Sequence, residues 1–183
     1  MTTFNDTDGG ALQVLADSMG AEPTNVEAKF GMSTHRDGQV RSMAAVKSCG
    51  RRGQTHAHGF TIGIDEPIEL LDTNTARHPQ EVLQAALNAC MTAGHACHAA
   101  VMSLKPRSLE SVTTCALDLL GFPGLDESII PGHDEVQHSI CSDGGGTHGP
   151  FEEIHQAVMR TAPSLAHDAR PVHSVPRRIV DTR

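Results

Sequence analysis

A long uncharged segment constrains the fold of this chain of 183 residues more than any other feature. From Val82 to Leu104 there is no Asp, Glu, Lys or Arg, and alanine is found at positions 85, 86, 89, 93, 96, 99 and 100. Alanine is the strongest helix former, and its small side chain lets neighbouring backbones approach closely. Pro79 suits the first turn of a helix, and Pro106 would end one. We therefore predict a helix over 79–103, about 37 Å long at about 1.5 Å per residue.

Shorter patterns on both sides of this helix predict strands and two further helices. Alternating apolar residues predict strands, and apolar residues at helical spacing predict helices. The expected strands cover 25–32, 40–46, 57–64, 108–120, 136–141 and 172–180, and the expected helices cover 10–19 and 151–161. This order of elements is typical of an α+β fold and not of alternating βαβ units. We expect residues 1–24 to form an N-terminal extension and residues 25–183 to form a single domain.

Charge and composition favour some partners over others. A formal net charge of −8 argues against nucleic acid, whose phosphates require clustered Lys and Arg. The chain has no Tyr or Trp and 38% apolar residues, so we expect a second copy to supply what a monomeric core lacks.

The same features predict where the protein works. Residues 82–104 are long enough to cross a bilayer, but Gln84, Asn88 and two histidines argue against a membrane span. The first twenty residues have no basic start and no long apolar run, which argues against a secretory signal. The five cysteines lack the spacing of a disulfide framework, so we predict a cytoplasmic protein with free thiols.

Cys90 lies in the middle of the predicted helix and is either an inert core residue or a nucleophile. Cys97 shares its helical face but lies about 10.5 Å away along the axis, too far for a disulfide within one intact helix. As a thiolate, Cys90 would need a nearby cation. Arg36 is a candidate, although an exposed turn charge is the simpler interpretation. Gln80 or Glu81 could orient this arginine, but both lie nearly three turns before Cys90.

The helix also contains potential metal ligands. They fan around the axis instead of converging on one point: Cys90, His95, Cys97 and His98. His56 and His58 share one face of a predicted strand and could add ligands. Because metal sites fix ligand geometry tightly, a zinc or nickel site is the less favoured alternative, and we expect neither a metal nor a cofactor.

Four segments form a combined pattern. Residues 79–91 read PQEVLQAALNACM, Asp65-Glu66-Pro67 precedes Leu70-Leu71, residues 118–126 read DLLGFPGLD, and residues 151–180 contain the closing elements. This combination resembles the OsmC/Ohr family of osmotically inducible and organic-hydroperoxide-resistance proteins, over about residues 25–180. The resemblance implies an OsmC-like α+β fold, in which a long central helix packs against antiparallel sheets in an intertwined homodimer.

The resemblance also implies a chemistry in oxidative-stress defence. Cys90 matches the family's peroxidatic cysteine, whose thiolate attacks an organic hydroperoxide and becomes a sulfenic acid. Arg36 resembles the position of the family's activating arginine. The implied partners are a second copy of the chain, an organic hydroperoxide or another small apolar ligand, and a small-thiol or dithiol reductant.

The chain departs from the family pattern at two positions. Gln80 stands where the family has the glutamate that holds the arginine, and the adjacent Glu81 points about 100° away on the helix. Ala162 stands before Pro163, where the peroxidase branches have a resolving cysteine. A small thiol or another cysteine (Cys49, Cys115 or Cys141) would then have to reduce Cys90. The alternative function is a non-catalytic small-molecule binder in which Cys90 only lines the pocket.

Overall fold

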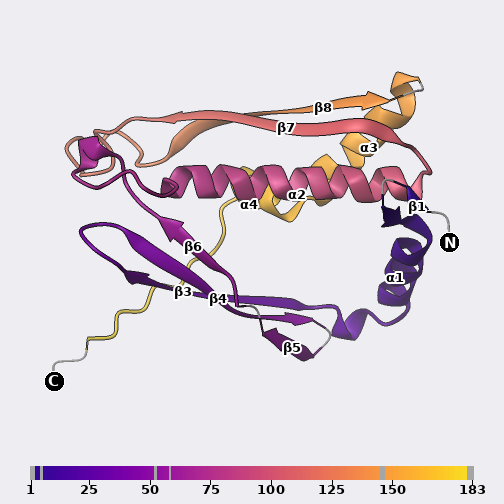
Figure 1. The fold of residues 1–183 in the computed structure, drawn as a ribbon, viewed down its shortest axis with the longest axis horizontal. Coiled ribbons are helices and arrows are strands. Elements are labelled where there is room, and N and C mark those ends of the chain that lie inside the picture. The colour runs from indigo at the N-terminus through magenta and orange to yellow at the C-terminus, as the bar shows by residue number, and fades with distance from the viewer. Residues whose placement is uncertain (1–2, 5, 52, 58, 145–146, 181–183) are drawn as a thin grey trace.

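The chain folds in layers around one long central helix. The computed structural model describes residues 3–4, 6–51, 53–57, 59–144 and 147–180. Figure 1 shows helix α2 (Pro79–Val101) between a long two-stranded hairpin on one side and a four-stranded sheet on the other. The predicted α+β class is confirmed.

Helix α2 begins where the sequence predicts, because hydrogen bonds cap its first turn. Pro79 is the first helical residue, and the Nδ1 atom of His78 accepts a hydrogen bond from the backbone N–H of Gln80 at 3.1 Å. The Glu81 carboxylate accepts one from the backbone N–H of His78 at 2.9 Å, which completes a capping box. The helix ends at Val101, two residues before the predicted end. Among the described residues, no helix is both long and apolar enough to cross a membrane.

The antiparallel hairpin covers one side of α2. Its strands β7 (Pro106–Leu117) and β8 (His133–Gly144) overlap the predicted strands 108–120 and 136–141, and alternate residues of both are partly buried. Asn88 joins the hairpin to the helix, because its side-chain oxygen accepts hydrogen bonds from the hydroxyls of Ser111, at 2.9 Å, and Thr113.

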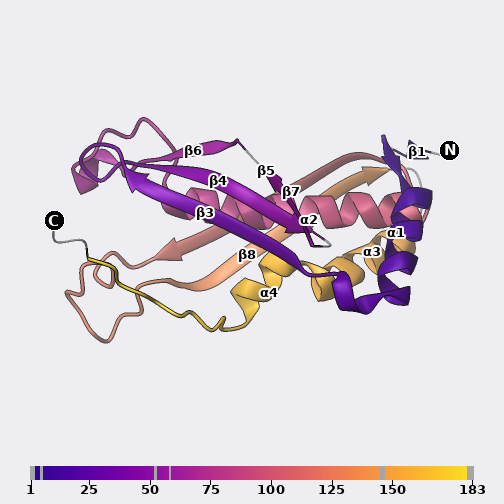
Figure 2. The ribbon, with the colours of Figure 1, turned by 90° about the horizontal axis from the view of Figure 1, so that it is seen from below.

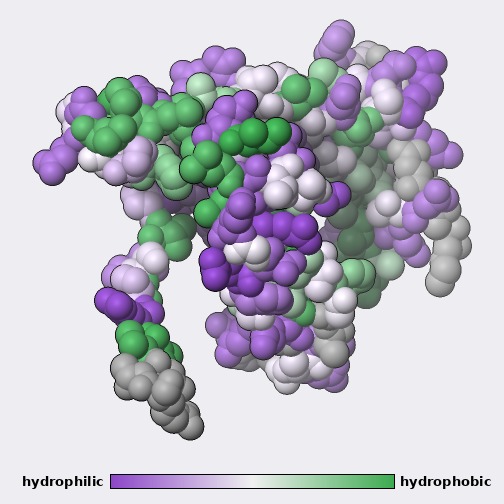
Figure 3. All heavy atoms as spheres, turned by 60° about the vertical axis from the view of Figure 1, so that its left-hand side comes forward, coloured by the Kyte–Doolittle hydropathy of each residue, from purple (hydrophilic) through white to green (hydrophobic). Residues whose placement is uncertain are grey.

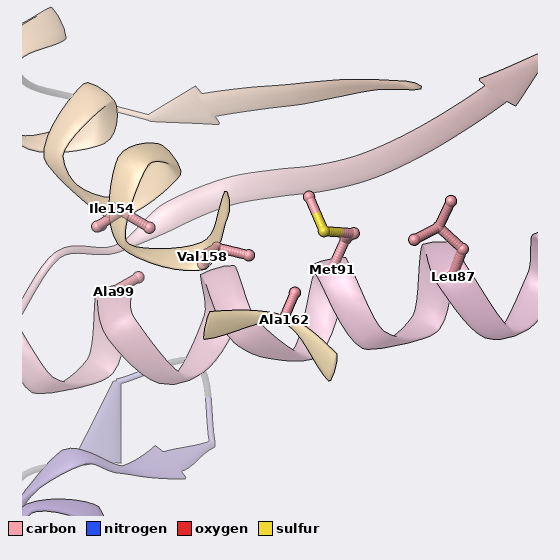
Figure 4. Close-up of a cluster of buried hydrophobic side chains, with 6 residues drawn as sticks. All are labelled: Leu87, Met91, Ala99, Ile154, Val158 and Ala162. Atoms are coloured by element: carbon pink, nitrogen blue, oxygen red, sulfur yellow. The ribbon is translucent and has the colours of Figure 1, made fainter. Parts of the chain in front are cut away.

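A small apolar core joins α2 to two C-terminal helices, α3 (His148–Thr161) and α4 (Pro163–Ala169), which lie beside α2 (Figure 2). Gly94 permits the close packing, since a Cβ atom there would lie 3.1 Å from Cγ1 of Val158. Helix α3 confirms the helix predicted over 151–161, while α4 was not predicted. Pro163 ends α3 but also suits the first position of the next helix. The buried core residues are Leu87, Met91, Ala99, Ile154, Val158 and Ala162 (Figure 4).

The four-stranded sheet leaves much apolar surface exposed. In this antiparallel sheet β4 (Ser42–Arg51) pairs with β3 (Ala28–Arg36), β5 (Gln54–Ala57) and β6 (Thr61–Ile64). Every residue of β3 except Ser33 is exposed. The side chain of Phe30 on this strand is 85% exposed. Figure 3 shows separate hydrophobic patches among hydrophilic residues on one face of the molecule.

The predicted strands of this region are present with shifted bounds. The strand expected over 25–32 is β3, and that expected over 40–46 is β4, which runs on to Arg51. The strand expected over 57–64 is divided into β5 and β6, which both pair with β4. Gly59 lies between them, consistent with glycine as an interruption in a strand.

Helix α1 (Gly9–Ala21) packs across the C-terminal end of α2 and confirms the helix predicted over 10–19. The Asp8 carboxylate caps it by accepting a hydrogen bond from the backbone N–H of Ala11 at 2.9 Å. A Cβ atom on Gly9 would collide with the carbonyl oxygen of Ala100, so only glycine allows this approach. The short elements are β1 (Thr3–Phe4), β2 (Thr7–Asp8), and the 3-10 turns η1 (Pro23–Asn25) and η2 (Ile68–Leu70).

The strand predicted over 172–180 is wrong. Residues 171–180 have no regular secondary structure and are exposed, and they lead away from the helices to the C-terminus in Figure 1. Pro171 and Pro176 lack the N–H donors that a strand needs, so the alternating pattern between them is not sufficient.

A buried carboxylate organises the loop that leads into α2. Asp65, 2% exposed, accepts hydrogen bonds from the Thr73 hydroxyl at 2.7 Å, the Thr75 N–H at 2.7 Å and the Glu66 N–H at 2.9 Å. The bond from Thr73 and then that from Thr75 hold the pKa of Asp65 well below its ordinary value. Asp72 is also buried, and burial, followed by the neighbouring Asp65, raises the pKa of its carboxyl group.

These opposite shifts predict opposite effects of asparagine at the two positions. We expect Asp65→Asn to lower the melting temperature at neutral pH, because Asp65 stabilises the fold above its unfolded pKa of about 3.9. That contribution is lost as the pH falls through the lower folded pKa. Asp72 has a raised folded pKa, so stability is lost as the pH rises through that value. Asparagine imitates the neutral form, and Asp72→Asn is expected to raise the melting temperature at neutral pH.

Thermal unfolding followed by circular dichroism from acidic to neutral pH checks both expectations. The two variants are matched controls for each other, because each replaces one carboxylate of the same pair by an amide. Equal melting temperatures for both variants at neutral pH would contradict the assigned roles.

Candidate functional site

Cys90 lies on α2 at the border between the core and the exposed surface. Its side chain is half-buried and packs against the core cluster that includes Leu87 and Met91. At about 100° per residue, its direction lies between these buried residues and an exposed small-residue stripe of α2. This stripe consists of Ala85, Ala86, Ala89 and Ala93. The thiol thus has apolar neighbours on one side and an uncovered helix surface on the other.

Arg36, the candidate cation, is the last residue of β3 rather than a turn residue. Its side chain is exposed, and its Nη1 atom donates to the backbone carbonyl of Gln39 at 3.4 Å, across the β3–β4 turn. This contact within the turn does not bring the guanidinium to Cys90.

Gln80 and Glu81, the other two candidates, bind groups near the start of α2. Glu81 caps the helix through the backbone N–H of His78. The side-chain oxygen of Gln80 lies 3.1 Å from Nε2 of His133, on β8. The hydrogen bonds found for these two side chains therefore serve the helix terminus and β8, rather than Arg36 or Cys90.

A second thiol shares this histidine. The Sγ atom of Cys115, on β7, lies 3.6 Å from the same Nε2 atom of His133, and both residues are partly buried. The other ring nitrogen, Nδ1, lies 2.9 Å from the backbone carbonyl oxygen of Ala116. A carbonyl oxygen only accepts hydrogen bonds, so Nδ1 carries the proton. The Gln80 oxygen beside Nε2 is also an acceptor, so it fits a ring in which both nitrogens donate. In the neutral ring Nε2 has a lone pair that can accept the Cys115 proton, and the Gln80 oxygen then cannot bind it.

A bulge in the hairpin places His133 there. Cys115 pairs with Val136, and in a regular ladder Leu117 would pair with Asp134. Instead Leu117 pairs with His133, so β8 contains one extra residue at this point. Sequence reasoning missed His133, because neither its spacing from Cys115 nor its neighbours indicates this register.

The histidines of α2 are not arranged as a metal site. His95 Nδ1 donates to the carbonyl of Met91 at 2.8 Å, and its Nε2 lies 3.3 Å from Nδ1 of His155. His98 Nδ1 donates in the same way to the carbonyl of Gly94 at 2.9 Å. Burial is the main cause that lowers the pKa of His95.

No group of three or more potential metal ligands converges among the described residues. His56 lies on β5 with an exposed side chain, and His58 lies outside the described residues.

Ala162, the residue before Pro163, is buried in the same cluster against which Cys90 packs. Cys97 lies two turns along α2 from Cys90, and no disulfide joins any two of the described cysteines. Position 162 therefore has a methyl group in this cluster and no sulfur.

Comparison with known proteins identifies the fold. No family model and no curated protein matches the chain. An OsmC-like protein from Mycoplasma pneumoniae is similar in structure, with a TM-score of 0.61 and 14% identity, covering 77% of this chain and 87% of that one. A putative osmotic stress induced and detoxification response protein from Psychrobacter arcticus has a TM-score of 0.57 and 15% identity, covering 76% and 88%. An organic hydroperoxide resistance protein OsmC from Legionella pneumophila has a TM-score of 0.50 and 12% identity, covering 75% and 86%. The chain therefore has the OsmC-like fold that its sequence predicts.

Proposed function

We propose that the protein is a thiol-dependent peroxidase that reduces organic hydroperoxides through Cys90. The observation that supports this most directly is the position of Cys90, which is half-buried at the edge of an apolar cluster, on the part of α2 that has no charged residue. An apolar flank suits the organic part of a hydroperoxide, and the uncovered side gives the peroxide oxygen access to sulfur. The similar Legionella protein is described as an organic hydroperoxide resistance protein and a predicted redox protein.

The proposed reaction has two stages. The Cys90 thiolate attacks one peroxide oxygen, the O–O bond breaks, and the alkoxide leaves as an alcohol after taking up a proton. Cys90 is then a sulfenic acid. A small thiol attacks its sulfur and releases water, and a second thiol exchanges with the resulting disulfide to restore Cys90.

The reactive form also needs a cation beside the thiolate. We propose Arg36 for this role, acting from a second copy of the chain, because no contact between its guanidinium and Cys90 is found among the described residues of one chain. A homodimer would also cover the alanine stripe of α2 and the exposed face of β3. The five cysteines lack the spacing of a disulfide framework, which fits a reducing cytoplasm, where we propose that the protein works.

The alternative function is a non-catalytic binder in which Cys90 lines the pocket. Two observations favour it. Gln80 contacts His133 in place of an arginine, and Ala162 offers no sulfur to resolve an oxidised Cys90. The oxidation product of Cys90 distinguishes these functions.

We expect one equivalent of cumene hydroperoxide to add one oxygen atom to Cys90 and to release cumyl alcohol. Intact mass and peptide mapping with a sulfenic-acid trap measure the protein product, and chromatography measures the alcohol. Cys90→Ser should abolish alcohol release, whereas Cys97→Ser, which changes a thiol on the same helix, should retain it. A folded wild-type protein that leaves the hydroperoxide intact would favour the binder.

We expect Ala162→Cys to change the oxidised product from a sulfenic acid to a disulfide between Cys90 and the introduced thiol, because position 162 lies in the cluster against which Cys90 packs. Thr161→Cys, with an exposed side chain one residue earlier, is the matched control and should form no such bond. Non-reducing peptide mapping separates the products. A sulfenic acid alone in both variants would show that position 162 is too distant from Cys90.

We expect Ala89→Glu to convert the proposed dimer into monomers, because it places a charge in the middle of the alanine stripe and an obligate interface of about 2,000 Å² or more would not accommodate it. Light scattering coupled to size exclusion gives the mass. Ala116→Glu, at an exposed position of β7, should remain dimeric. A monomeric wild-type chain with a folded spectrum would refute the dimer.

A further inference from the structure

We propose that Cys115 and His133 form a second nucleophilic thiol site, separate from Cys90, which exchanges with small disulfides and takes up a small thiol as a mixed disulfide. This site depends on a contact between β7 and β8 and does not depend on the peroxidase activity proposed for Cys90.

The first support is the geometry of the base. Thiol and imidazole are 3.6 Å apart, within hydrogen-bond range for sulfur. The carbonyl of Ala116 holds the opposite ring nitrogen at 2.9 Å, so the neutral ring presents a lone pair to the thiol. A nucleophile, a base and a group that orients the base are the three parts of an activated nucleophile.

Gln80 is a positioning residue for the same pair. Its side-chain oxygen lies 3.1 Å from Nε2 of His133. An oxygen acceptor suits the ring after Nε2 has accepted the thiol proton, because Nε2 is then a donor. Gln80 can therefore stabilise His133 after proton transfer without changing its place on α2.

The second support is a cavity beside the pair, which His133 lines although Cys115 does not. The lining of this cavity, of about 770 Å³, includes the apolar side chains of Leu87, Val136 and Met159. Charged side chains of both signs also line it, with Asp134 and Glu135 next to His133 on β8, and Arg160 opposite on α3. The apolar side chains and the charges of both signs that line this cavity together fit a small disulfide that bears ammonium and carboxylate groups.

The exchange step needs no reactant other than the protein thiol and the disulfide. The Cys115 thiol gives its proton to Nε2 of His133, and its sulfur attacks one sulfur of the disulfide. The disulfide S–S bond breaks as a new bond forms to Cys115. The leaving thiolate takes the proton from the imidazolium and departs as a thiol, so one disulfide and one protein thiol yield one mixed disulfide and one free thiol.

Several titratable groups of the described residues lie around His133. Cys115 faces it from β7 and the neutral Gln80 faces it from α2. The titratable residues that share the cavity which its ring lines are Asp134, Glu135, His138, Arg160, Asp168 and Arg170. The pH dependence of the exchange rate therefore tests His133 only when it is compared with a variant that leaves these groups in place.

The experiment follows cystine exchange at Cys115 in the full chain, using acid quenching and non-reducing peptide mapping to measure the rate at each cysteine separately. At pH 7 an ordinary thiol is only about 3% ionised. We expect His133→Gln to slow exchange at Cys115 about tenfold at pH 7, and the difference to disappear at high pH, where any accessible thiol is ionised. His148→Gln, at an exposed position of α3 outside this cavity, is the matched control and should have the wild-type rate.

Equal rates at pH 7 in wild-type protein and folded His133→Gln protein would overturn the proposal. If that variant does not fold, the wild-type rate profile decides. Exchange at Cys115 that persists below pH 7 supports a built-in base, whereas a single rise near pH 8.5, as for an unassisted thiol, contradicts it.

The mixed charges are tested with a second disulfide. We expect Arg160→Gln to slow exchange with cystine but not with uncharged 2-hydroxyethyl disulfide. Equal slowing of both reagents, or of neither, would overturn the assignment of a charged disulfide to this cavity. Gln80→Ala should slow exchange with both reagents, and recovery of the rate in Gln80→Asn would support positioning by an amide.

Discussion

The absence of charged side chains from α2 after Glu81 is the constraint on which the rest of the structure depends. A helix with small, uncharged side chains over more than one face can accept neighbours on several sides at once. The β7–β8 hairpin attaches through Asn88, α3 approaches at Gly94, and the N-terminal helix meets its last turn through Gly9. A lysine or glutamate at one of these contacts would have to be hydrated, but the neighbouring backbone occupies the space that the water would need.

The sequence predicts this framework well because its signals are local. The alanine-rich segment, Pro79 and the alternating residues of β7 each determine an element without reference to distant parts of the chain. The sequence-based prediction fails where an element depends on pairing with another segment more than on its own residue pattern. Residues 172–180 alternate as a strand would but have two prolines nearby, and no regular structure forms there.

The candidate site is harder to derive from sequence, because some side chains form hydrogen bonds with other partners than the motif predicts. The sequence makes Gln80 and the adjacent Glu81 candidates for orienting Arg36, yet one contacts a histidine on β8 and the other closes a capping box. His133 is separated from Cys115 by a long loop and becomes its neighbour only through the pairing of β7 with β8. Cys90 could be named as a candidate from the sequence because its surroundings on α2 are themselves local.

The bulge in β8 has an evolutionary consequence. Side chains alternate between the two faces of a strand, so the extra residue between Val136 and His133 decides which of two adjacent side chains faces α2. In a regular ladder over the same residues, Asp134 would pair with Leu117, and a carboxylate would lie where the imidazole now lies, without any substitution at Cys115 or Gln80. Deleting Asp134 or Glu135 would instead restore regular pairing with His133 still opposite Leu117. Homologues that have both residues but pair them regularly would therefore differ in the chemistry beside the thiol, even if every aligned residue around it were identical.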